Sequence, residues 1–382
     1  MLWKGNAIQL GSEVGKSHSR PLTLTALLRS YHAYVAGGTG TGKSKLLEWF
    51  LRQDIWSWCK SKCGLLLLSW HDDLYDNTVR FLAEGGYSTM PVVLVDFRKP
   101  DSIIGYNPLR QRPGDRSAIV EDLATGIIHA WGEGTPTSSP RTFKALQAIL
   151  GTLYFHGLPI TAARKLITSS AHRDRLVADL PATSVERFAW ETMPRKGDRF
   201  SEELEGAINR LGSFTSGAVV QRAFSFTGPG LDLASAMEDG AIVLVCLSTT
   251  GNPLGHPTAK LIGSLMLSDL WNCGRGRGKG TDKPFYVYLD EFQNFINPAM
   301  AQSLDEARGY GLHMTMAQQY PTQLRNDGPA GQSVYDSVLT NARARRSFSS
   351  STTLMIWRPS RSTCAGVRSD WTRSSINRRC GR

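Results

Sequence analysis

Residues 37–44 read Gly-Gly-Thr-Gly-Thr-Gly-Lys-Ser and match the phosphate-binding pattern G-x-x-x-x-G-K-[ST] at every fixed position. Glycines at Gly37, Gly40 and Gly42 let the backbone take conformations closed to other residues and bring N–H groups against phosphate oxygens. In this pattern Lys43 reaches the β- and γ-phosphates, and the Ser44 hydroxyl ligates Mg²⁺. The expected nucleotide-binding residues are Gly37, Gly38, Thr39, Gly40, Thr41, Gly42, Lys43 and Ser44.

The flanking sequence has the order that this loop requires. Residues 31–36 before it read as a short buried strand, and residues 45–52 after it read as an amphipathic helix. A glycine loop between a strand and a helix places phosphates at the positive end of the helix. We therefore predict a nucleotide site with ATP and Mg²⁺ as cofactors.

A second candidate element lies far downstream, where residues 285–291 read Phe-Tyr-Val-Tyr-Leu-Asp-Glu. An apolar strand that ends in two carboxylates is typical of the Walker B element of nucleotide hydrolases. Asp290 is expected to hold Mg²⁺ through water, and Glu291 to polarise the attacking water, because phosphoryl transfer depends on positioning and charge neutralisation.

Composition bounds the class of protein. The 382 residues are 41% hydrophobic and 20% charged, which is ordinary for a globular protein. The longest aliphatic run, residues 65–68, is too short to span a bilayer, and the N-terminus has no signal-peptide pattern. Six cysteines without matching metal spacing favour reduced thiols over a zinc site. The expected location is the cytoplasm, with recruitment to the inner membrane by partners left open.

The net charge of +11 is unevenly distributed. Residues 341–382 contain ten arginines and one aspartate, so the rest of the chain carries only +2. Basicity therefore gives no argument that the folded body binds nucleic acid. The Arg- and Ser-rich segment itself has two interpretations: a disordered basic tail that contacts nucleic acid, or a segment read out of frame that replaces the next strand of the fold.

Apolar strands at residues 64–69 and 91–96 alternate with helices, which predicts an α/β fold with a parallel sheet covered on both faces. Strand character returns at residues 241–247, a helix follows at 257–272, and a further strand is expected at 311–317. The expected regions are a first core part at 1–113, an all-α insertion at 114–228, a second core part at 229–340 and the tail at 341–382.

The glycine- and arginine-rich residues 274–280 (Gly-Arg-Gly-Arg-Gly-Lys-Gly) stand between a predicted helix and the Asp290 strand. They are expected to form either a flexible solvated loop or a contact to phosphates.

With these residues placed, the chain resembles the HerA/FtsK superfamily of ring-forming P-loop ATPases, and within it the conjugative type IV secretion coupling proteins of the TraG/TraD-like type. The resemblance covers about residues 30 to 340. Besides the phosphate-binding loop, four features carry it: Gly-Tyr-Asn-Pro-Leu at 105–109, the Walker B-like Leu-Asp-Glu-Phe-Gln-Asn-Phe at 289–295, Ala-Arg-Gly-Tyr-Gly-Leu at 307–312 and Met-Ala-Gln-Gln-Tyr at 316–320.

The resemblance implies a RecA-like fold with an all-α insertion between the Walker elements. It implies that Arg308 acts as an arginine finger toward a neighbouring subunit, and that Gln319 is the sensor of the γ-phosphate or attacking water. An ordinary surface arginine and a polar strand-end residue remain the alternatives. The chain departs from the family at Ser-Trp-His-Asp-Asp-Leu, residues 69–74, and in the strand expected after the sensor.

The implied function is an ATP-hydrolysing ring motor, hexameric, that translocates DNA in conjugation. The implied partners are single-stranded DNA, further copies of the chain, and relaxosome or type IV secretion channel components. Two alternatives stay open: a secretion-apparatus ATPase that moves protein or pilin, and a nucleotide-binding remnant without turnover. An ATPase assay with and without single-stranded DNA separates the three.

Overall fold

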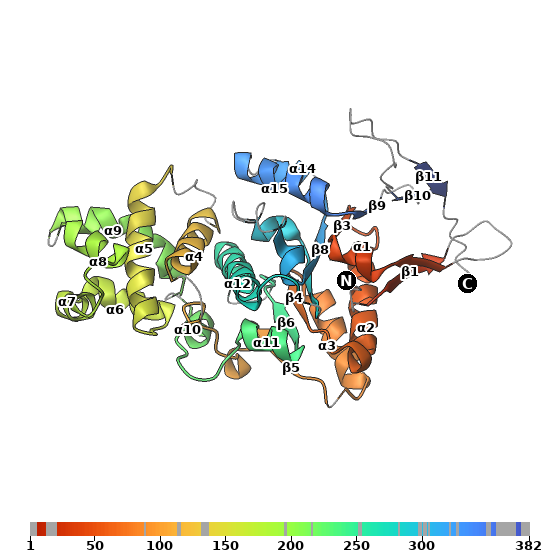
Figure 1. The fold of residues 1–382 in the computed structure, drawn as a ribbon, viewed down its shortest axis with the longest axis horizontal. Coiled ribbons are helices and arrows are strands. Elements are labelled where there is room, and N and C mark those ends of the chain that lie inside the picture. Colours follow the sequence, from red (N-terminus) through yellow and green to blue (C-terminus); the bar gives the residue numbers. More distant parts are fainter. Residues whose placement is uncertain are drawn as a thin grey trace.

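A computed structural model of the chain describes residues 6–12, 21–87, 89–112, 116–130, 137–194, 197–214, 217–250, 254–281, 283–296, 300, 304, 306–320, 322–325, 328–348, 353–356 and 372–375. A block of helices lies at one end of the long axis of the molecule, and a sheet-containing core lies at the other (Figure 1). No helix within the described residues has the length and apolar character needed to cross a membrane.

The core contains a sheet of nine strands, in the order β11-β10-β9-β3-β8-β7-β4-β6-β5. Neighbours from β9 to β5 are parallel, whereas β10 is antiparallel to both β9 and β11. These strands are β3 (Ala33–Gly37), β4 (Leu65–Ser69), β5 (Val92–Asp96), β6 (Ile242–Cys246), β7 (Phe285–Leu289), β8 (Leu312–Gln318), β9 (Ala344–Phe348), β10 (Thr353–Ile356) and β11 (Thr372–Ser375). The predicted α/β fold with a mainly parallel sheet is confirmed.

Successive residues of the buried strands enter two different hydrophobic clusters, because side chains alternate between the faces of a sheet. On one face, Tyr286 and Tyr288 of β7 join Leu47 and Leu51 in a cluster with the helix that follows the glycine loop. On the other face, Val287 of β7 joins the cluster that extends into the helical block. Both faces of the sheet are thus covered, as continuous apolar strands predict.

The first face is covered by α2 (Lys43–Ser61) and α3 (Asp72–Glu84), and by a separate hairpin of β1 (Ile8–Ser12) and β2 (Pro21–Leu24). The short α1 (Ala26–Ser30) leads into β3. The second face carries α12 (His256–Arg277), the 3-10 helix η4 (Phe292–Phe295) and α15 (Gly328–Asn341), whereas α14 (Thr322–Arg325) and η5 (Arg308–Tyr310) flank β8 in sequence.

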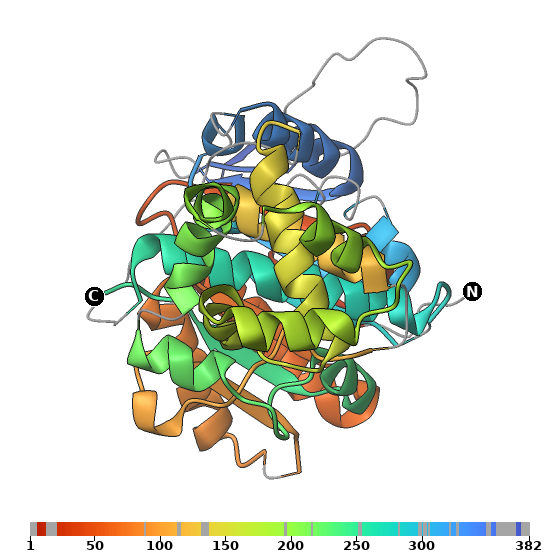
Figure 2. The same cartoon turned by 90° about the vertical axis from the view of Figure 1, so that its left-hand side faces the viewer.

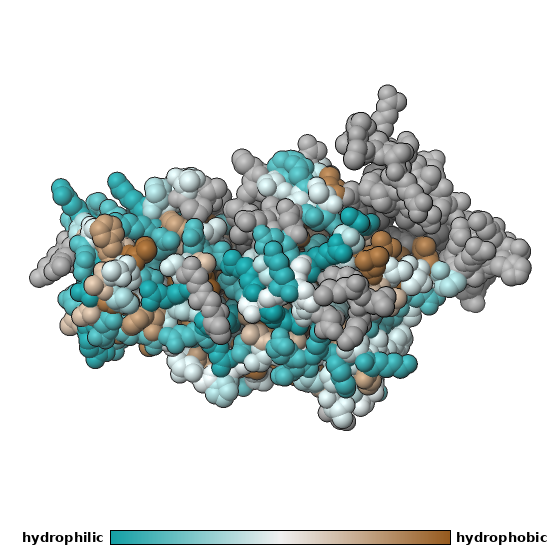
Figure 3. Space-filling model, in the orientation of Figure 1, coloured by the Kyte–Doolittle hydropathy of each residue, from teal (hydrophilic) through white to brown (hydrophobic). Residues whose placement is uncertain are grey.

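The block between the two core parts is entirely helical in its described residues, which confirms the predicted all-α insertion. Its helices lie at the end of the molecule away from the sheet (Figure 1) and face the viewer in Figure 2, and α4 packs on α12 of the core. They are α4 (Arg116–Ala130), α5 (Pro140–Phe155), η2 (Ile160–Ala162), α6 (Ala163–Thr168), α7 (Ser170–Ala178), α8 (Val185–Thr192), α9 (Asp198–Leu211), η3 (Gly212–Phe214) and α10 (Ala218–Phe224). The core parts on either side contribute η1 (Pro100–Ser102) and α11 (Leu233–Asp239). Hydrophilic residues dominate the face in Figure 3, with hydrophobic residues in small scattered groups.

Two sequence expectations require correction. The first concerns residues 274–280, because α12 continues to Arg277 instead of ending before a loop. A Cβ on Gly274 would lie 2.8 Å from Cδ1 of Leu312, so this glycine allows close packing. Arg275 pairs with Asp122, and Arg277 pairs with Glu238 at 2.9 Å. Tertiary contacts therefore hold the segment in a helix and engage its two arginines.

The second correction concerns the strand expected to be missing after the sensor strand. Residues Ala344–Phe348 form β9, which pairs in parallel with β3 along its whole length, from Ala33 opposite Ala344 to Gly37 opposite Phe348. Backbone hydrogen bonds make this pairing, so it needs no apolar run in the sequence. The sheet therefore continues into the segment predicted to be a tail. Residues 349–352, 357–371 and 376–382 of that segment lie outside the described residues.

Candidate nucleotide-binding site

The glycine loop connects β3 to α2 at the carboxyl edge of the sheet. Gly40 has φ 76° and Gly42 has φ 97°, both in the left-handed region that favours glycine. Gly37 instead ends β3 in an extended conformation, so it does not need this freedom, contrary to our expectation. The N–H and hydroxyl of Thr41 donate to the Gly38 carbonyl at 3.3 and 2.7 Å, which closes the turn.

Lys43 occupies the first position of α2, directly after Gly42. Its ammonium group forms an ion pair with Oε1 of Glu291, and the two side chains are only 7% and 4% exposed. The fold thus joins the glycine loop to the Walker B strand across 248 residues of sequence. A buried cation beside a buried carboxylate, at the start of a long helix, is an arrangement suited to phosphate chemistry.

Glu291 receives hydrogen bonds from several further side chains. Nε2 of Gln293 donates to Oε2 at 2.8 Å, and Nε2 of Gln319 donates to Oε1 at 3.3 Å. Burial acts to raise the pKa of Glu291, but the close approach of His71 and the hydrogen bonds from Gln293 and Lys43 outweigh it and lower the pKa to about 2. The carboxyl group is therefore ionised at neutral pH and is held from several sides.

Asp290 has a different environment, although it is the next residue. Its side chain is buried, and neither carboxylate oxygen has a hydrogen-bond partner among the described residues. Burial raises the pKa of Asp290 to about 6, against the attraction of Lys43. Hard carboxylate oxygens without protein donors fit a Mg²⁺ ion, and the hydroxyl of Ser44, in the first turn of α2, would be the second protein oxygen.

Gln319 lies between the two Walker elements. Besides its bond to Glu291, its Oε1 accepts a hydrogen bond from the hydroxyl of Thr39 at 3.5 Å. It directly follows β8, the neighbour of β3 and β7 in the sheet. The structure therefore brings Gln319 together with the glycine loop and the second carboxylate.

His71 was not predicted as a site residue. It follows β4 within the turn whose role the sequence left uncertain, and its Nε2 lies 3.7 Å from Oε1 of Glu291. The nearby Glu291 carboxylate raises the pKa of His71, although burial opposes this. His71 lies near Glu291 because β4 and β7 are neighbours in the sheet. The order of the strands cannot be read from the sequence, so sequence reasoning had no signal for this contact.

Arg308 lies at the opposite edge of the sheet and joins none of these contacts. It stands before β8, whereas Gln319 stands after it, and seven strand residues span about 23 Å. The guanidinium carbon of Arg308 lies 3.6 Å from the centre of the Tyr31 ring, and that of Arg343 lies at the same distance. Two guanidinium groups this close to one ring must occupy its opposite faces.

One protein family model matches part of this chain. Residues 284–370 match a family model described as the TraM recognition site of TraD and TraG. The match extends beyond β9 into the Arg- and Ser-rich segment. No curated protein matches the chain.

Solved structures share the fold at low sequence identity. The coupling protein TrwB in complex with ADP and Mg²⁺ has a TM-score of 0.59 and 14% identity, with 92% of this chain and 79% of that chain covered. The unbound monoclinic form of the bacterial conjugative coupling protein TrwBdeltaN70 has a TM-score of 0.57 and 13% identity, with 92% of this chain and 78% of that chain covered. VirB4 of Thermoanaerobacter pseudethanolicus has a TM-score of 0.53 and 14% identity, with 90% of this chain and 85% of that chain covered.

These findings confirm the resemblance drawn from the sequence: residues 284–370 match the TraD and TraG family model, and the chain shares the fold of solved conjugative coupling proteins.

Proposed function

We propose that this chain is an ATP-hydrolysing motor of the conjugative DNA-transfer type. The observation that carries the proposal is the buried contact between Lys43 and Glu291, which places a phosphate-binding cation against a candidate base at the carboxyl edge of a parallel sheet. TrwB has been solved in complex with ADPNP and in complex with ADP and Mg²⁺, which supports the same ligands here.

In this proposal the loop N–H groups of residues 38–44 cradle the phosphates, and Lys43 turns from Glu291 toward the β- and γ-phosphate oxygens. Ser44 and Asp290 would hold Mg²⁺, which, when bound, neutralises charge on the phosphates. Glu291 then orients the attacking water and accepts its proton, while Gln319 donates a hydrogen bond to the water or to the γ-phosphate. His71 and Gln293 keep the Glu291 carboxylate in place.

We further propose that the chain acts as a ring, expected to be a hexamer, with Arg308 directed at the nucleotide of a neighbouring copy. Action of Arg308 at the nucleotide site of its own chain is unfavourable, because Arg308 and Gln319 lie at opposite ends of β8. A guanidinium group can spread positive charge over the γ-phosphate as negative charge develops there.

DNA as the cargo and a relaxosome protein as a partner rest on the family match, whose description names TraM recognition. The secretion-ATPase alternative is favoured by a different observation, the likeness to VirB4. Recruitment to the inner membrane would come through such partners.

ATP turnover measured with and without single-stranded DNA tests the proposal. Turnover that single-stranded DNA increases is the expected result. Turnover that DNA leaves unchanged would favour the secretion ATPase, and nucleotide binding without turnover would identify a remnant. In the last case the motor proposal would be wrong. The presence of β9 beside β3 weighs against a remnant, because the core sheet is continued where the sequence predicted a gap.

A further inference from the structure

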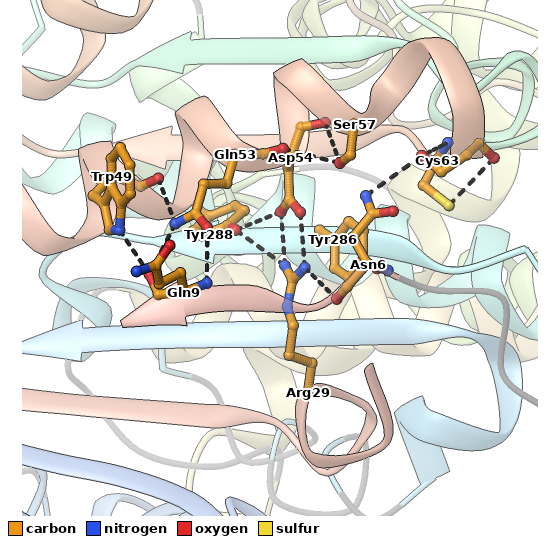
Figure 4. Close-up of polar contacts among 11 residues, drawn as sticks. Asn6, Gln9, Arg29, Trp49, Gln53, Asp54, Ser57, Cys63, Tyr286 and Tyr288 are labelled. Carbon is orange, nitrogen blue, oxygen red and sulfur yellow. Dashed lines mark hydrogen bonds and ion pairs between the residues drawn. The ribbon is translucent and has the colours of Figure 1, made fainter. Parts of the chain in front are cut away.

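A buried polar triad of Arg29, Asp54 and Tyr288 lies between α1, the glycine-loop helix α2 and β7 (Figure 4). The guanidinium group of Arg29 donates two hydrogen bonds to the Asp54 carboxylate, both at 2.7 Å. The hydroxyl of Tyr288 donates to Oδ2 of Asp54 at 2.6 Å and accepts from Arg29 at 3.1 Å. Each of the three residues thus contacts the other two.

The triad is closed against solvent. Arg29, Asp54 and Tyr288 are 3%, 1% and 0% exposed. The Arg29 guanidinium also stacks on the Tyr286 ring at 3.7 Å and donates to the Asn6 carbonyl at 3.1 Å. Removing an ion pair from water carries a desolvation cost, and apolar replacements of such pairs are often neutral or stabilising. Stability alone is therefore a poor explanation of why charges lie here.

The positions of the three residues point to a second explanation. Asp54 follows Lys43 by eleven residues on α2, which is close to three helical turns, so both lie on the same face of this helix. Tyr288 precedes Asp290 by two residues, so both side chains are directed to the same face of the sheet. Arg29 belongs to α1, directly before β3. The triad therefore connects α2, which begins at the glycine loop, to β7, which leads into the Walker B carboxylates, and to α1, which precedes β3.

We propose that Arg29, Asp54 and Tyr288 are positioning residues that fix the Walker B strand against the glycine-loop helix, so that Asp290 and Ser44 can hold one Mg²⁺ ion. The inference rests on the proposed function, since it concerns the metal of that same site. None of the three residues touches the nucleotide. They hold α2 and β7 at a fixed distance. Residues just outside the ligands of other metal sites orient those ligands in the same way.

The chain contains a matched control. Arg112 forms an ion pair with Asp269, and the hydroxyl of Tyr106 donates to the same carboxylate at 2.8 Å. Tyr106 and Asp269 are also buried and the Arg112 side chain is 10% exposed, but these residues join the segment after the 105–109 turn to α12 beside the insertion. The control triad thus has the same residue types and similar burial, without contact to either Walker element.

The test replaces the charges of each triad by apolar side chains of similar size. The variants are Arg29→Met with Asp54→Leu, and the control Arg112→Met with Asp269→Leu. For each full chain, calorimetric titration of ADPNP at a series of Mg²⁺ concentrations gives the Mg²⁺ concentration that half-maximally strengthens nucleotide binding, and thermal unfolding gives the stability.

We expect the first double variant to melt at or above the temperature of the unaltered chain, yet to require about tenfold more Mg²⁺. The control double variant should show an unchanged Mg²⁺ requirement. An unchanged requirement in a folded first variant, or the same increase in the control, would overturn the inference. If the unaltered chain binds ADPNP without any Mg²⁺ dependence, the proposed metal site is wrong, and the inference falls with it.

A milder pair covers the case in which a double variant does not fold. Tyr288→Phe removes only the hydroxyl group that contacts Arg29 and Asp54, and Tyr106→Phe removes the equivalent hydroxyl of the control triad. Tyr288→Phe should raise the Mg²⁺ requirement several-fold, in the range of outer-shell effects, while Tyr106→Phe leaves it unchanged. Equal Mg²⁺ requirements for these two folded variants would contradict the positioning role.

Discussion

The two edges of the central sheet differ in what they present. At the carboxyl edge, Lys43, Glu291 and Gln319 meet in one buried cluster of complementary charges. At the amino edge, Arg308 and Arg343 stack on Tyr31, and both guanidinium groups are positive. The same strands run between the edges, because β3 joins Tyr31 to the glycine loop and β8 joins Arg308 to Gln319.

The difference shows which parts of the proposed chemistry one chain can supply alone. The carboxyl edge contains the residues needed to hold a nucleotide and orient a water. The amino edge contains cations that cannot reach that site within the same chain, because a strand's length lies between them. If the amino edge takes part in hydrolysis, it does so at the nucleotide of a second copy.

The largest effect is expected from Arg308→Ala. If Arg308 stabilises the transition state in a neighbouring copy, its loss should lower ATP turnover about a thousandfold, in the range of known arginine fingers. Mixing Arg308→Ala chains with Glu291→Gln chains should recover part of the turnover, since some interfaces then combine an intact site with an intact arginine. If assemblies shown to contain both variants recover no turnover, Arg308 is an ordinary surface arginine that does not act on a neighbouring copy.

The next largest effect concerns the carboxyl edge. Glu291→Gln keeps nearly the same shape and can still contact Gln293, but the amide cannot accept a proton. ATP turnover should fall about a hundredfold or more, with ATP affinity retained. Phosphate release and equilibrium binding measure the two quantities on one preparation. Turnover equal to that of the unaltered chain would show that Glu291 is not the base.

Lys43→Ala should have a smaller effect, and on binding. Removing one charge-assisted hydrogen bond to phosphate weakens nucleotide binding by about 1.5–3 kcal/mol. The buried Glu291 also loses its cation, so circular dichroism must show that the variant is folded. Wild-type affinity for ATP in a folded Lys43→Ala chain would mean that the glycine loop does not hold the phosphates.

The smallest effect is expected from removing residues 349–382, which contain seven arginines and one aspartate. This truncation keeps β9 beside β3 and removes only the edge strands β10 and β11, whereas truncation at residue 341 would also remove β9, the neighbour of β3. If the removed segment binds DNA, affinity for single-stranded DNA should fall. The slope of log affinity against log salt concentration should also become shallower, by about 0.7 for each phosphate that the segment neutralises. An unchanged slope would show that this segment does not contact the phosphates of DNA.

The sequence predicted those features that depend on residue type within one short stretch. The loop at 37–44 and the pair Asp290–Glu291 were found because their chemistry requires glycines, a lysine and carboxylates in a fixed order. The alternating apolar strands were found because buried parallel strands read as continuous apolar runs.

The features that were missed depend on pairings between distant residues. His71 reaches Glu291 only through the order of strands, and Tyr288 meets Arg29 across 259 residues. β9 reads Ala-Arg-Arg-Ser-Phe and was missed because backbone pairing with β3, not an apolar pattern, makes it a strand. The last turn of α12 was missed because Gly274 reads as a helix breaker, although its packing against Leu312 requires a small residue.

The most direct test of the central claim is a single-turnover experiment at the carboxyl edge. The full chain is loaded with radiolabelled ATP and Mg²⁺, excess nucleotide is removed, and the bound label is followed over time in the presence of single-stranded DNA. The account predicts that bound ATP is converted to ADP and phosphate, and that Glu291→Gln holds ATP without converting it. Recovery of intact ATP from the unaltered chain would contradict the account.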